Sequence, residues 1–599
     1  MTTAILSFTI AGRVTFRCDS LGIDDRRDLE PDPPFASWAQ RYATANASRE
    51  LLLDLGVDVG RWLDGEQHWL GRLIQATAPV VLEIETDPHP GPVERAALDA
   101  PWELVARVDP TAGVGTVAVA EDPVDGLRDV AATVTARPGA ASPPTHEVQH
   151  ARHLALDPGL LLTCVRRLGT SVTPRSASPY RLSVAFLAAQ PDGLAGLDVD
   201  REEVAVRQAT GTIGIDLAVE DSGNLERLGE LVAQVGDCDV IHISCHGALS
   251  GEPTLALEGS LGERVDATAA QLSLGIGRKP RLAFLSACST AGAGDALWSL
   301  SADLCRRGWP AVLGWSCRVS DRGAIELAAA LYRQLTIRLP LVEAVAQARL
   351  GFALGPQGAE WHKARLFLGP AGGGAIVSGT RPQPIWPDVL GDPEFLDPRT
   401  RRIRVAGPDQ PVVHRRALQR VLAALRDTRH PGVVIHGGDE LARATLAARA
   451  LRRLSRELPS VVVARDFDTP AILGALSAQT ARAEVDRLAG RYRERVRSDP
   501  GQLLLALRGI LEGPCRDPGG GALVLVLHGF DPVPDPGASP DHRRNLGPTQ
   551  LVVARAVIGA FSGARTASRL LLTSAAPFSV VTDGGDLADT LFSQSLDMP

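Results

Sequence analysis

Short apolar runs alternate with amphipathic segments through most of the chain after Tyr180. RLSVAFLAAQ, VIHISCHG, RLAFLSAC and AVLGWSC have the length and composition of buried strands, whereas NLERLGELVAQV and AIELAAALYRQLTIRL follow the period of a helix. One stripe of the last segment consists of Ile325, Ala328, Leu331 and Leu335. Strands that alternate with helices are connected by right-handed crossovers, which give a mostly parallel sheet. The sequence therefore predicts an α/β fold in which helices flank a mostly parallel sheet.

The length of the chain predicts more than one domain. A single hydrophobic core rarely serves 599 residues, so we expect two or more domains of ordinary size. Residues 1–75 are predicted to be a strand and helix segment of the first domain, which continues through residues 76–376. The interval from Pro138 to about Ser178, which contains ARPGAASPPTHE, is expected to be an exposed loop. Residues 377–412 are predicted to be a linker to a second α/β domain at residues 413–599.

Composition and charge disfavour several classes of protein. The formal net charge is −8 and there is no long basic run, so we expect no nucleic-acid partner. The N-terminal MTTAILSFTIAGRV lacks the features of a signal peptide, and no stretch is long enough to span a bilayer. We therefore expect a cytoplasmic protein without a membrane partner. The eight cysteines show no metal-ligand spacing, which argues against a disulfide framework and against a zinc site.

Two of the apolar runs end in reactive side chains. CDVIHISCHG ends at His246 and Gly247, and PRLAFLSAC ends at Cys288. Side chains alternate along a strand, so Ser244 shares a face with His246, and Ser286 shares a face with Cys288. If the two strands are neighbours in a parallel sheet, both reactive residues emerge at its carboxyl edge, where open α/β sheets place their sites. The pattern predicts a site for thiol chemistry.

The chemistry of such a site is acyl transfer to water. A thiol is a useful nucleophile as a thiolate, which requires a nearby base or positive charge. His246 can take the proton of Cys288 and later give one to the leaving amine. The backbone N–H groups of Gly247 and Cys288 can hold the oxyanion of the tetrahedral intermediate. No metal or organic cofactor is required.

The residues alone also allow a plainer interpretation. Cys288 can be a small buried thiol, and His246 a hydrogen-bonded surface histidine. His242 and Cys245 lie beside His246 and could indicate a metal site, but Cys245 points to the opposite face of the strand from both histidines. We therefore expect His242 to be structural, and Cys305 and Cys317 to belong to the core.

The two reactive runs resemble the paired signatures of the CHAT family, which are caspase-like cysteine proteases related to separases and caspases. The resemblance extends from LDAPWELVA to LVEAVAQARLGF and covers approximately residues 75–370. It implies that His246 is the catalytic histidine, Cys288 the nucleophile and Gly247 an oxyanion contributor. The glycine that often follows the family's cysteine is here Gly292.

The resemblance also implies a wall of the substrate pocket just after the next strand. Trp315 and Asp321 lie there, and Asp321 could attract a basic side chain of the substrate. Alternatively, Asp321 could cap the helix that starts at RGAIELAAAL, because Ser320 and Asp321 directly precede it. We favour the cap.

The second domain contains a segment similar to a phosphate-binding loop. GVVIHGGDELARATLAARAL resembles the Walker A segment of signal-transducing STAND-type P-loop ATPases, which follows G-x-x-x-x-G-K-[ST]. The candidate nucleotide-binding residues are Gly437, Gly438, Arg443 and Thr445. Counted from Gly437, Ala442 replaces the second glycine, Arg443 the lysine and Ala444 the serine or threonine. Three functional positions of the loop are therefore altered.

Further departures indicate that this module is degenerate. Asp439 and Glu440 place negative charge in a loop that should cradle phosphates. The other altered positions are His528 in place of the magnesium-associated aspartate, with Asp531 offset, Ala576 in place of an arginine, and His414 in place of a glycine. We expect no ATP hydrolysis, whereas weak nucleotide binding stays open.

Together these patterns predict a cysteine endopeptidase of CHAT type that acts on a protein or peptide substrate. By analogy, its C-terminal domain is expected to gate the peptidase in a bacterial conflict or signalling system, in response to an activating protein partner. Two other hypotheses remain. The chain could be a non-catalytic scaffold that binds a partner, or its C-terminal domain could be a working ATP-dependent switch.

Overall fold

The computed structural model places most of the chain. It describes residues 1–9, 12–45, 48–76, 79–108, 132–133, 150–179, 181–210, 215–248, 251–288, 299–378, 395–397, 402–407, 415–455, 457–458, 460–465, 467–517, 521–532 and 543–596. Gly292, His414 and most of the predicted linker lie outside these residues. The chain forms two compact units, Met1–Ile385 and Trp386–Pro599, and each is described by itself.

A large mixed sheet forms the centre of the first unit. Among the described residues its order is β11 (Ile215–Glu220), β10 (Leu182–Ala188), β12 (Val240–Ser244), β16 (Leu282–Ser286), β17 (Ala311–Trp315), β18 (Ala364–Leu368), β8 (Thr163–Leu168), β4 (Val80–Thr86), β1 (Thr2–Thr9), β2 (Arg13–Cys18) and β3 (Ile23–Asp28). Neighbouring strands are parallel except at β17–β18 and along β1–β2–β3. The predicted mostly parallel sheet is confirmed.

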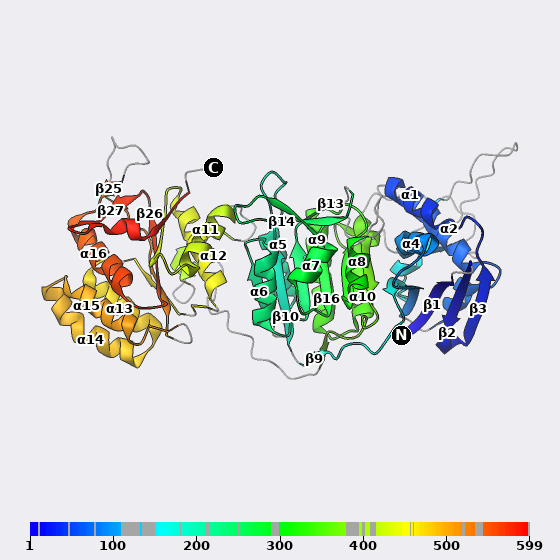
Figure 1. Ribbon diagram of the computed structural model, residues 1–599, viewed down its shortest axis with the longest axis horizontal. Coiled ribbons are helices and arrows are strands. Elements are labelled where there is room, and N and C mark those ends of the chain that lie inside the picture. The colour runs from blue at the N-terminus through cyan, green and yellow to red at the C-terminus, as the bar shows by residue number, and fades with distance from the viewer. Residues whose placement is uncertain are drawn as a thin grey trace. The chain divides into compact units, whose positions relative to one another are not determined.

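Helices cover both faces of this sheet, so its central strands are buried throughout, as parallel strands usually are. One layer contains α5 (Val199–Ala209), α9 (Asp321–Thr336) and α10 (Leu341–Ala353), and another contains α6 (Leu225–Val235), α7 (Ala269–Gly275) and α8 (Leu300–Arg306) (Figure 1). The stripe predicted for α9 is confirmed, because its four residues are all buried.

The carboxyl edge of the sheet carries a small antiparallel sheet. The chain leaves β12 at Cys245 and enters β13 (His246–Ala248), which pairs with β14 (Thr254–Glu258), and β14 pairs with β15 (Arg264–Thr268). We predicted one continuous strand through His246. Instead, the run changes sheets at Cys245, so that His246 begins a strand above the main sheet (Figure 1).

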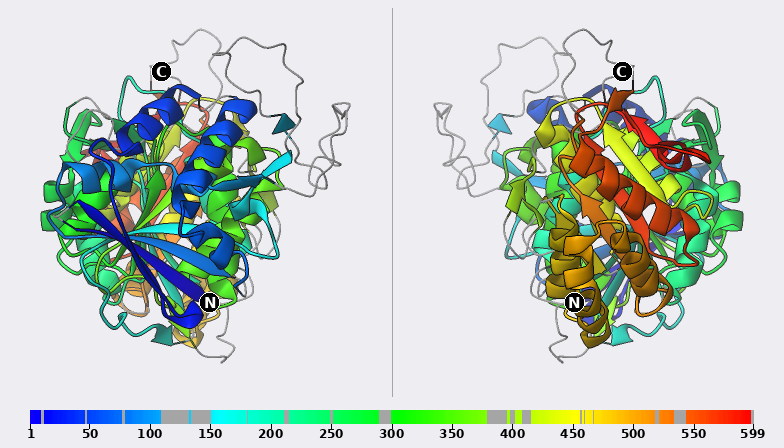
Figure 2. Two further views of the ribbon diagram at one scale, coloured as in Figure 1. Left: turned by 90° about the vertical axis from the view of Figure 1, so that its right-hand side faces the viewer. Right: turned by 90° about the vertical axis from the view of Figure 1, so that its left-hand side faces the viewer.

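The N-terminal segment completes the far side of the first unit. Its strands β1, β2 and β3 lie side by side at the sheet edge (Figure 2). The helices that follow are α1 (Phe35–Ala45), α2 (Arg49–Asp64), α3 (Trp69–Leu73) and α4 (Pro92–Asp99), and the short strands are β5 (Ala106–Val108), β6 (Ala132–Thr133) and β7 (His150–His153). An aromatic cluster of Phe35, Trp38, Trp62 and Trp102 packs between these helices.

Strand β8 corrects one expectation. It lies within the interval from Pro138 to Ser178, in which we predicted an exposed loop, yet it is buried near the middle of the main sheet. Two adjacent arginines, Arg166 and Arg167, interrupt its apolar run and obscure the pattern. The fold buries both because Glu103 and Glu83 pair with them, and paired charges can lie inside a protein.

The second unit is built on a parallel sheet. Among the described residues its order is β23 (Ser460–Ala464), β24 (Leu523–Leu527), β26 (Arg569–Ser574), β22 (Gly432–His436) and β30 (Phe592–Ser595). One face packs on α11 (Arg415–Arg426) and α12 (Glu440–Leu454), and the other on α13 (Thr469–Thr480), α14 (Ala483–Ser498), α15 (Gln502–Glu512) and α16 (Pro548–Gly563) (Figure 2). Strand β30 follows RLLLTSAAPFSV, which we predicted to be the last strand.

Within the described parts of both units, none of the helices combines the length and the apolar character needed to cross a membrane.

Candidate active site

The two reactive strand ends lie next to each other. Strands β12 and β16 are parallel neighbours in which Ser244 is opposite Ser286, and His246 and Cys288 each follow two residues later. The two strands are thus neighbours in a parallel sheet, which is the condition on which the predicted thiol site depends. A Cβ built on Gly247 would lie 2.0 Å from the carbonyl oxygen of Cys288 and 3.5 Å from its amide nitrogen. The backbones at Gly247 and Cys288 are therefore in direct contact, and only glycine fits there.

His246 has a fixed hydrogen bond on one side of its ring. The imidazole is partly exposed, and its Nε2 lies 2.8 Å from the carbonyl oxygen of Ala195, in the loop between β10 and α5. A carbonyl can only accept, so Nε2 carries a proton and donates it. In the neutral ring, Nδ1 is then the nitrogen that can accept a proton.

Cys288 follows β16 directly, and its side chain is partly exposed. Its Sγ lies 3.7 Å from the carbonyl oxygen of Val319, a distance that suits a thiol donating a weak hydrogen bond. Within the described residues, the hydrogen bonds of His246 and Cys288 run to backbone carbonyls rather than between the two side chains. The thiol is thus in a resting position, beside the histidine strand but not bonded to its ring.

Asp321 lies at the rim of this site and connects two loops. Its carboxylate accepts the backbone N–H of Asp198 at 3.0 Å. Burial raises the pKa of Asp321, as do the negative charges of Glu202 and Asp198, while the Asp198 N–H and the charge of His246 act in the opposite direction. The Asp321 carboxylate therefore lies close enough to His246 for the charges of the two side chains to interact.

The helix cap that we favoured for Asp321 belongs to its neighbour. Ser320 is the N-cap of α9, and its Oγ accepts the backbone N–H of Gly323 at 3.0 Å. Asp321 is the first residue of the helix, where a negative side chain interacts favourably with the helix dipole.

Trp315 and Cys317 do not lie where we expected them, whereas Cys305 does. Trp315 ends β17 with 0% of its surface exposed, so its side chain belongs to the hydrophobic core and not to a pocket wall that a substrate can reach. Cys305 is buried as expected, whereas Cys317 is partly exposed. Its Sγ lies 3.9 Å from the hydroxyl of Tyr42.

A buried polar cluster beneath the site was not predicted. The carboxylate of Glu202, on α5, lies 3.0 Å from Nε2 of His242, and the hydroxyls of Ser244 and Ser286 donate to it. His242 is fully buried, which confirms its structural role. The sequence held one signal for Glu202, because Val199, Glu202 and Val206 are spaced as one inward stripe of a helix.

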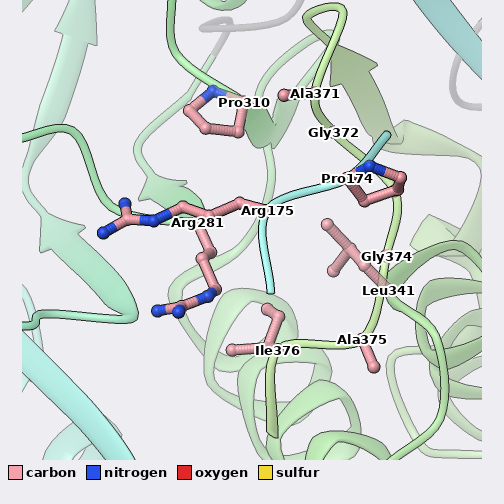
Figure 3. A pocket seen from close by; sticks show the side chains of 11 residues that line it. Pro174, Arg175, Arg281, Pro310, Leu341, Ala371, Gly372, Gly374, Ala375 and Ile376 are labelled. Carbon is pink, nitrogen blue, oxygen red and sulfur yellow. The ribbon is translucent and has the colours of Figure 1, made fainter. Parts of the chain in front are cut away.

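A small pocket lies at the other end of the sheet (Figure 3). Arg281 and Pro310, which line it, directly precede the strands β16 and β17. The guanidinium of Arg281 binds Asp239, and that of Arg175 binds Asp237. This pocket is therefore at the amino edge of the strands, away from Cys288, and its charged groups are already paired.

In the loop between β22 and α12, which is similar to a phosphate-binding loop, the polar groups bind one another. Gly437 and Gly438 adopt positive φ values of 75° and 59° between β22 and α12. The guanidinium of Arg443 is buried and donates to their carbonyl oxygens, at 3.1 Å and 2.7 Å. The carboxylate of Asp439 accepts the N–H of Ala442 at 2.6 Å. The groups that would meet a phosphate are thus used within the loop.

The remaining nucleotide candidates also have internal partners. Thr445 donates its hydroxyl proton to Leu441 and accepts the backbone N–H of Ala406. His528 lies 2.9 Å from the hydroxyl of Thr573 and 3.4 Å from the carboxylate of Glu440. Burial lowers the pKa of His528, against the raising effect of Glu440. In the described parts of the chain, no cluster of three or more His, Cys, Asp or Glu residues is arranged for a metal ion.

In the comparisons with known proteins, a family model matches part of this chain. Residues 130–384 match the model of the CHAT domain. No curated protein matches the chain. Among solved structures, the complex of Porphyromonas gingivalis RgpB pro- and mature domains has 8% identity and a TM-score of 0.30, over 56% of this chain and 75% of that chain. The Arg-specific cysteine proteinase gingipain R has 12% identity and a TM-score of 0.29, over 57% and 74%. The Saccharomyces cerevisiae separase–securin complex has 14% identity and a TM-score of 0.22, over 35% and 14%.

Proposed function

We propose that this chain is a cysteine endopeptidase that cleaves protein or peptide substrates with His246 and Cys288. The observation that carries the proposal is the contact between Gly247 and the backbone of Cys288, which brings the two reactive strand ends together at the carboxyl edge of the sheet. The match of residues 130–384 to the CHAT domain supports the same assignment.

In the proposed reaction, the Cys288 thiol first leaves the Val319 carbonyl and turns toward the imidazole. Nδ1 of His246 takes the thiol proton while Sγ forms a bond to the carbonyl carbon of the substrate. The carbonyl oxygen becomes an oxyanion, which the backbone N–H groups of Gly247 and Cys288 stabilise. The intermediate collapses as the imidazolium gives its proton to the leaving amine, which leaves an acyl-enzyme.

Hydrolysis of the acyl-enzyme reverses these roles. His246 removes a proton from water, the hydroxide adds to the thioester carbon, and a second oxyanion forms at the same position. The bond between the carbonyl carbon and Sγ then breaks and releases the acid product, and the imidazolium returns its proton to the sulfur atom. The hydrogen bond from Nε2 to Ala195 holds the ring in one orientation through both halves. Every proton step uses Nδ1, so the tautomer that the Ala195 carbonyl favours is the one that the reaction needs.

The resting position of the thiol favours a gated enzyme. Cys288 donates to Val319 instead of the imidazole, so a rearrangement must precede attack. We assign the control of this step to the C-terminal unit, as a degenerate relative of STAND-type modules. Because Arg443 and Asp439 fill the loop, a protein partner is a better candidate for the activating signal than ATP.

The test compares the full chain with its Cys288→Ala and His246→Ala variants on a peptide library, with and without cell extract as a source of the activator. We expect the wild type to cleave and both variants to lose at least about a thousandfold in rate. Cys317→Ala is the matched control, because Cys317 is the other partly exposed cysteine and should not be needed. Equal cleavage by all four proteins would refute the peptidase.

A non-catalytic scaffold is the alternative that the resting thiol also allows. Alkylation of Cys288 by iodoacetamide separates the two, since it needs no substrate. If His246 serves as its base, His246→Ala should slow alkylation of Cys288 at neutral pH. Because the resting thiol donates to Val319, the comparison is made with the cell extract present as the source of the activator. An unchanged rate under this condition would favour the scaffold.

A further inference from the structure

The buried carboxylate of Glu202 lies directly beneath the candidate active site. Only 2% of the residue is exposed, and it is one of the buried residues of α5, a helix that lies on the main sheet (Figure 1). Oε1 lies 3.0 Å from Nε2 of His242 and 2.7 Å from Oγ of Ser286. Oε2 lies 2.6 Å from Oγ of Ser244. Three side chains from two strands thus converge on one carboxylate.

The two serines connect this carboxylate to the reactive residues. Ser244 and Ser286 are opposite each other in the register of β12 and β16. Each serine is the last residue of its strand, and the reactive residue follows it two positions later in the sequence. A shift of either serine relative to Glu202 is therefore passed on to His246 or Cys288.

The hydrogen bonds of the cluster have defined directions. Burial alone would raise the pKa of Glu202, but the charge of His242 and the hydrogen bonds from His242 and both serines lower it. The carboxylate is thus ionised and can only accept, so each of its three partners donates. Nδ1 of His242 lies 3.3 Å from the hydroxyl of Tyr332, which extends the cluster to α9. Fully satisfied networks of this kind specify one arrangement.

The loop that leads into the helix of Glu202 also holds the ring of His246. The loop that enters α5 supplies the Ala195 carbonyl to Nε2 of His246. Asp198, the N-cap of α5, donates its backbone N–H to the carboxylate of Asp321. Helix α5 in turn packs against α9, which begins at Asp321. Helix α5 and the loop that leads into it therefore contact both reactive strands and the histidine itself.

We propose that Glu202 is a positioning residue that sets how His246 and Cys288 face each other, by holding Ser244 and Ser286 side by side. The inference rests on the proposed peptidase function. Glu202 does not touch the substrate, so it acts through the strands. A purely structural Glu202 would change how much of the chain folds, whereas a positioning Glu202 changes the chemistry of each folded molecule.

The variants separate the effects of the length, the charge and the packing of the Glu202 side chain. Glu202→Gln keeps the length of the side chain: its amide oxygen can accept from His242 and Ser286, and its amide group can donate to Ser244 after the hydroxyl turns. Glu202→Leu keeps the volume and removes every acceptor. Ser244→Ala with Ser286→Ala removes both strand contacts with a small change in volume, so that one informative variant survives if Glu202→Leu fails to fold.

The matched control is Glu83→Gln. Glu83 is another buried carboxylate of the first unit, on β4, where it pairs with Arg167. Its loss should lower stability without touching β12 or β16. Every rate is normalised to the folded fraction, measured by urea titration of the same full-length protein.

The first readout is the rate at which iodoacetamide alkylates Cys288 with the cell extract present, across the pH range in which thiols and imidazoles titrate. Peptide mass spectrometry measures this rate. We expect Glu202→Leu and the double serine variant to lose about 10- to 100-fold at neutral pH, the size of effect that a small misplacement has on catalysis. Their pH profiles should move toward that of His246→Ala. Glu202→Gln should restore most of the rate, and Glu83→Gln should match the wild type.

The second readout does not depend on peptidase chemistry. With His246→Cys in each background, disulfide formation between positions 246 and 288 reports whether the two strand ends face each other. We expect it to be at least about tenfold slower with Glu202→Leu or the double serine variant. Equal rates in all backgrounds would overturn the positioning role. If disulfide formation depends on Glu202 while His246→Ala leaves alkylation unchanged, the positioning role stands and the peptidase proposal fails.

Discussion

Gly247 lies so close to Cys288 that a single methyl group would not fit between them. A Cβ on Gly247 would be 2.0 Å from the carbonyl oxygen of Cys288, far inside the contact distance of two non-bonded atoms. The obstacle is backbone, which cannot turn aside as a long side chain can. This contact fixes the separation of the histidine strand end from the cysteine strand end.

We expect Gly247→Ala to abolish peptidase activity. The methyl group must push β13 away from Cys288, which separates His246 from the thiol and moves the two proposed oxyanion donors apart. The free energy of unfolding should fall by about 1–3 kcal/mol, the usual cost of overpacking. Peptide hydrolysis and urea unfolding of the full chain measure the two effects.

Gly277→Ala is the control for this substitution, because a Cβ on Gly277 would meet nothing within 4 Å and its φ is not positive. It should leave both activity and stability close to those of the wild type. Full activity in Gly247→Ala would show that the contact is not part of the site.

The α/β architecture could be predicted because it follows from local patterns, whereas the pairing of the reactive strands was a condition of the site hypothesis that the structure meets. Alternating strands and helices indicate a parallel sheet, and side-chain alternation places Ser286 and Cys288 on one face. Strand β8 escaped prediction because Arg166 and Arg167 look like surface residues until their buried partners are known. Those partners are distant in the chain, so no local pattern contains them.

The finer geometry of the site depends on tertiary contacts in the same way. The change of sheet at Cys245 depends on the pairing of β13 with β14, which the periodicity of the apolar run does not predict. Trp315 ends a strand where a pocket wall was expected, but helices on both faces bury it. Glu202 is one of several charges on a polar helix, although its position on the inward stripe is a usable signal.

Cysteine reactivity should follow the exposure of the eight thiols. Cys288 and Cys317 are partly exposed, and the other six are buried. Burial also raises the pKa of Cys245, with added effects from the charges of Cys288 and Glu202, so its thiolate is scarce. We expect iodoacetamide to label only Cys288 and Cys317 in the native chain, as read by mass spectrometry. Comparable labelling of Cys245 would show that the end of β12 opens to solvent.

The pair of Glu103 and Arg166 should dominate the acid sensitivity of the first unit. Their side chains are buried and share two hydrogen bonds, of 2.6 Å and 2.8 Å, and Arg365 lies 3.8 Å from the same carboxylate. Burial acts to raise the pKa of Glu103, but the arginines outweigh it and lower the pKa from 4.5 to about 2. The folded chain therefore binds this proton more weakly than the unfolded chain.

The direction of the pH dependence follows from that difference. The stabilisation is complete above about pH 4.5 and is lost as the pH falls toward about 2, with a size on the order of 3 kcal/mol. Glu103→Gln should cost about 3–5 kcal/mol at neutral pH, because it leaves buried arginines without their counter-charge, and it should flatten this acid limb. Urea titrations at several pH values measure both.

Asp54→Asn serves as the comparison for Glu103→Gln, because Asp54 pairs with Arg41 at the surface with 43% of its side chain exposed. Such pairs contribute at most about 1 kcal/mol. An unchanged acid limb in Glu103→Gln would mean that other carboxyls control the acid unfolding.

The loop between β22 and α12 should not bind ATP. Arg443 donates to the carbonyl oxygens of Gly437 and Gly438, and the carboxylate of Asp439 takes a backbone N–H at the start of α12 that a phosphate would need. A phosphate entering this loop would meet the negative charges of Asp439 and Glu440 and would have to displace internal hydrogen bonds. Isothermal titration of the full chain with ATP and magnesium should therefore show no saturable heat.

The Arg443→Ala variant tests whether Arg443 stabilises the loop or binds a phosphate. Its removal leaves the two glycine carbonyls without their donor, so we expect the free energy of unfolding to fall by about 1–3 kcal/mol, with no gain in ATP binding because Asp439 and Glu440 remain. Arg491→Ala, an exposed arginine on α14, is the control and should stay within about 0.5 kcal/mol of the wild type. Saturable binding of ATP by the wild type, lost in Arg443→Ala, would instead identify a working nucleotide switch and assign Arg443 to phosphate binding.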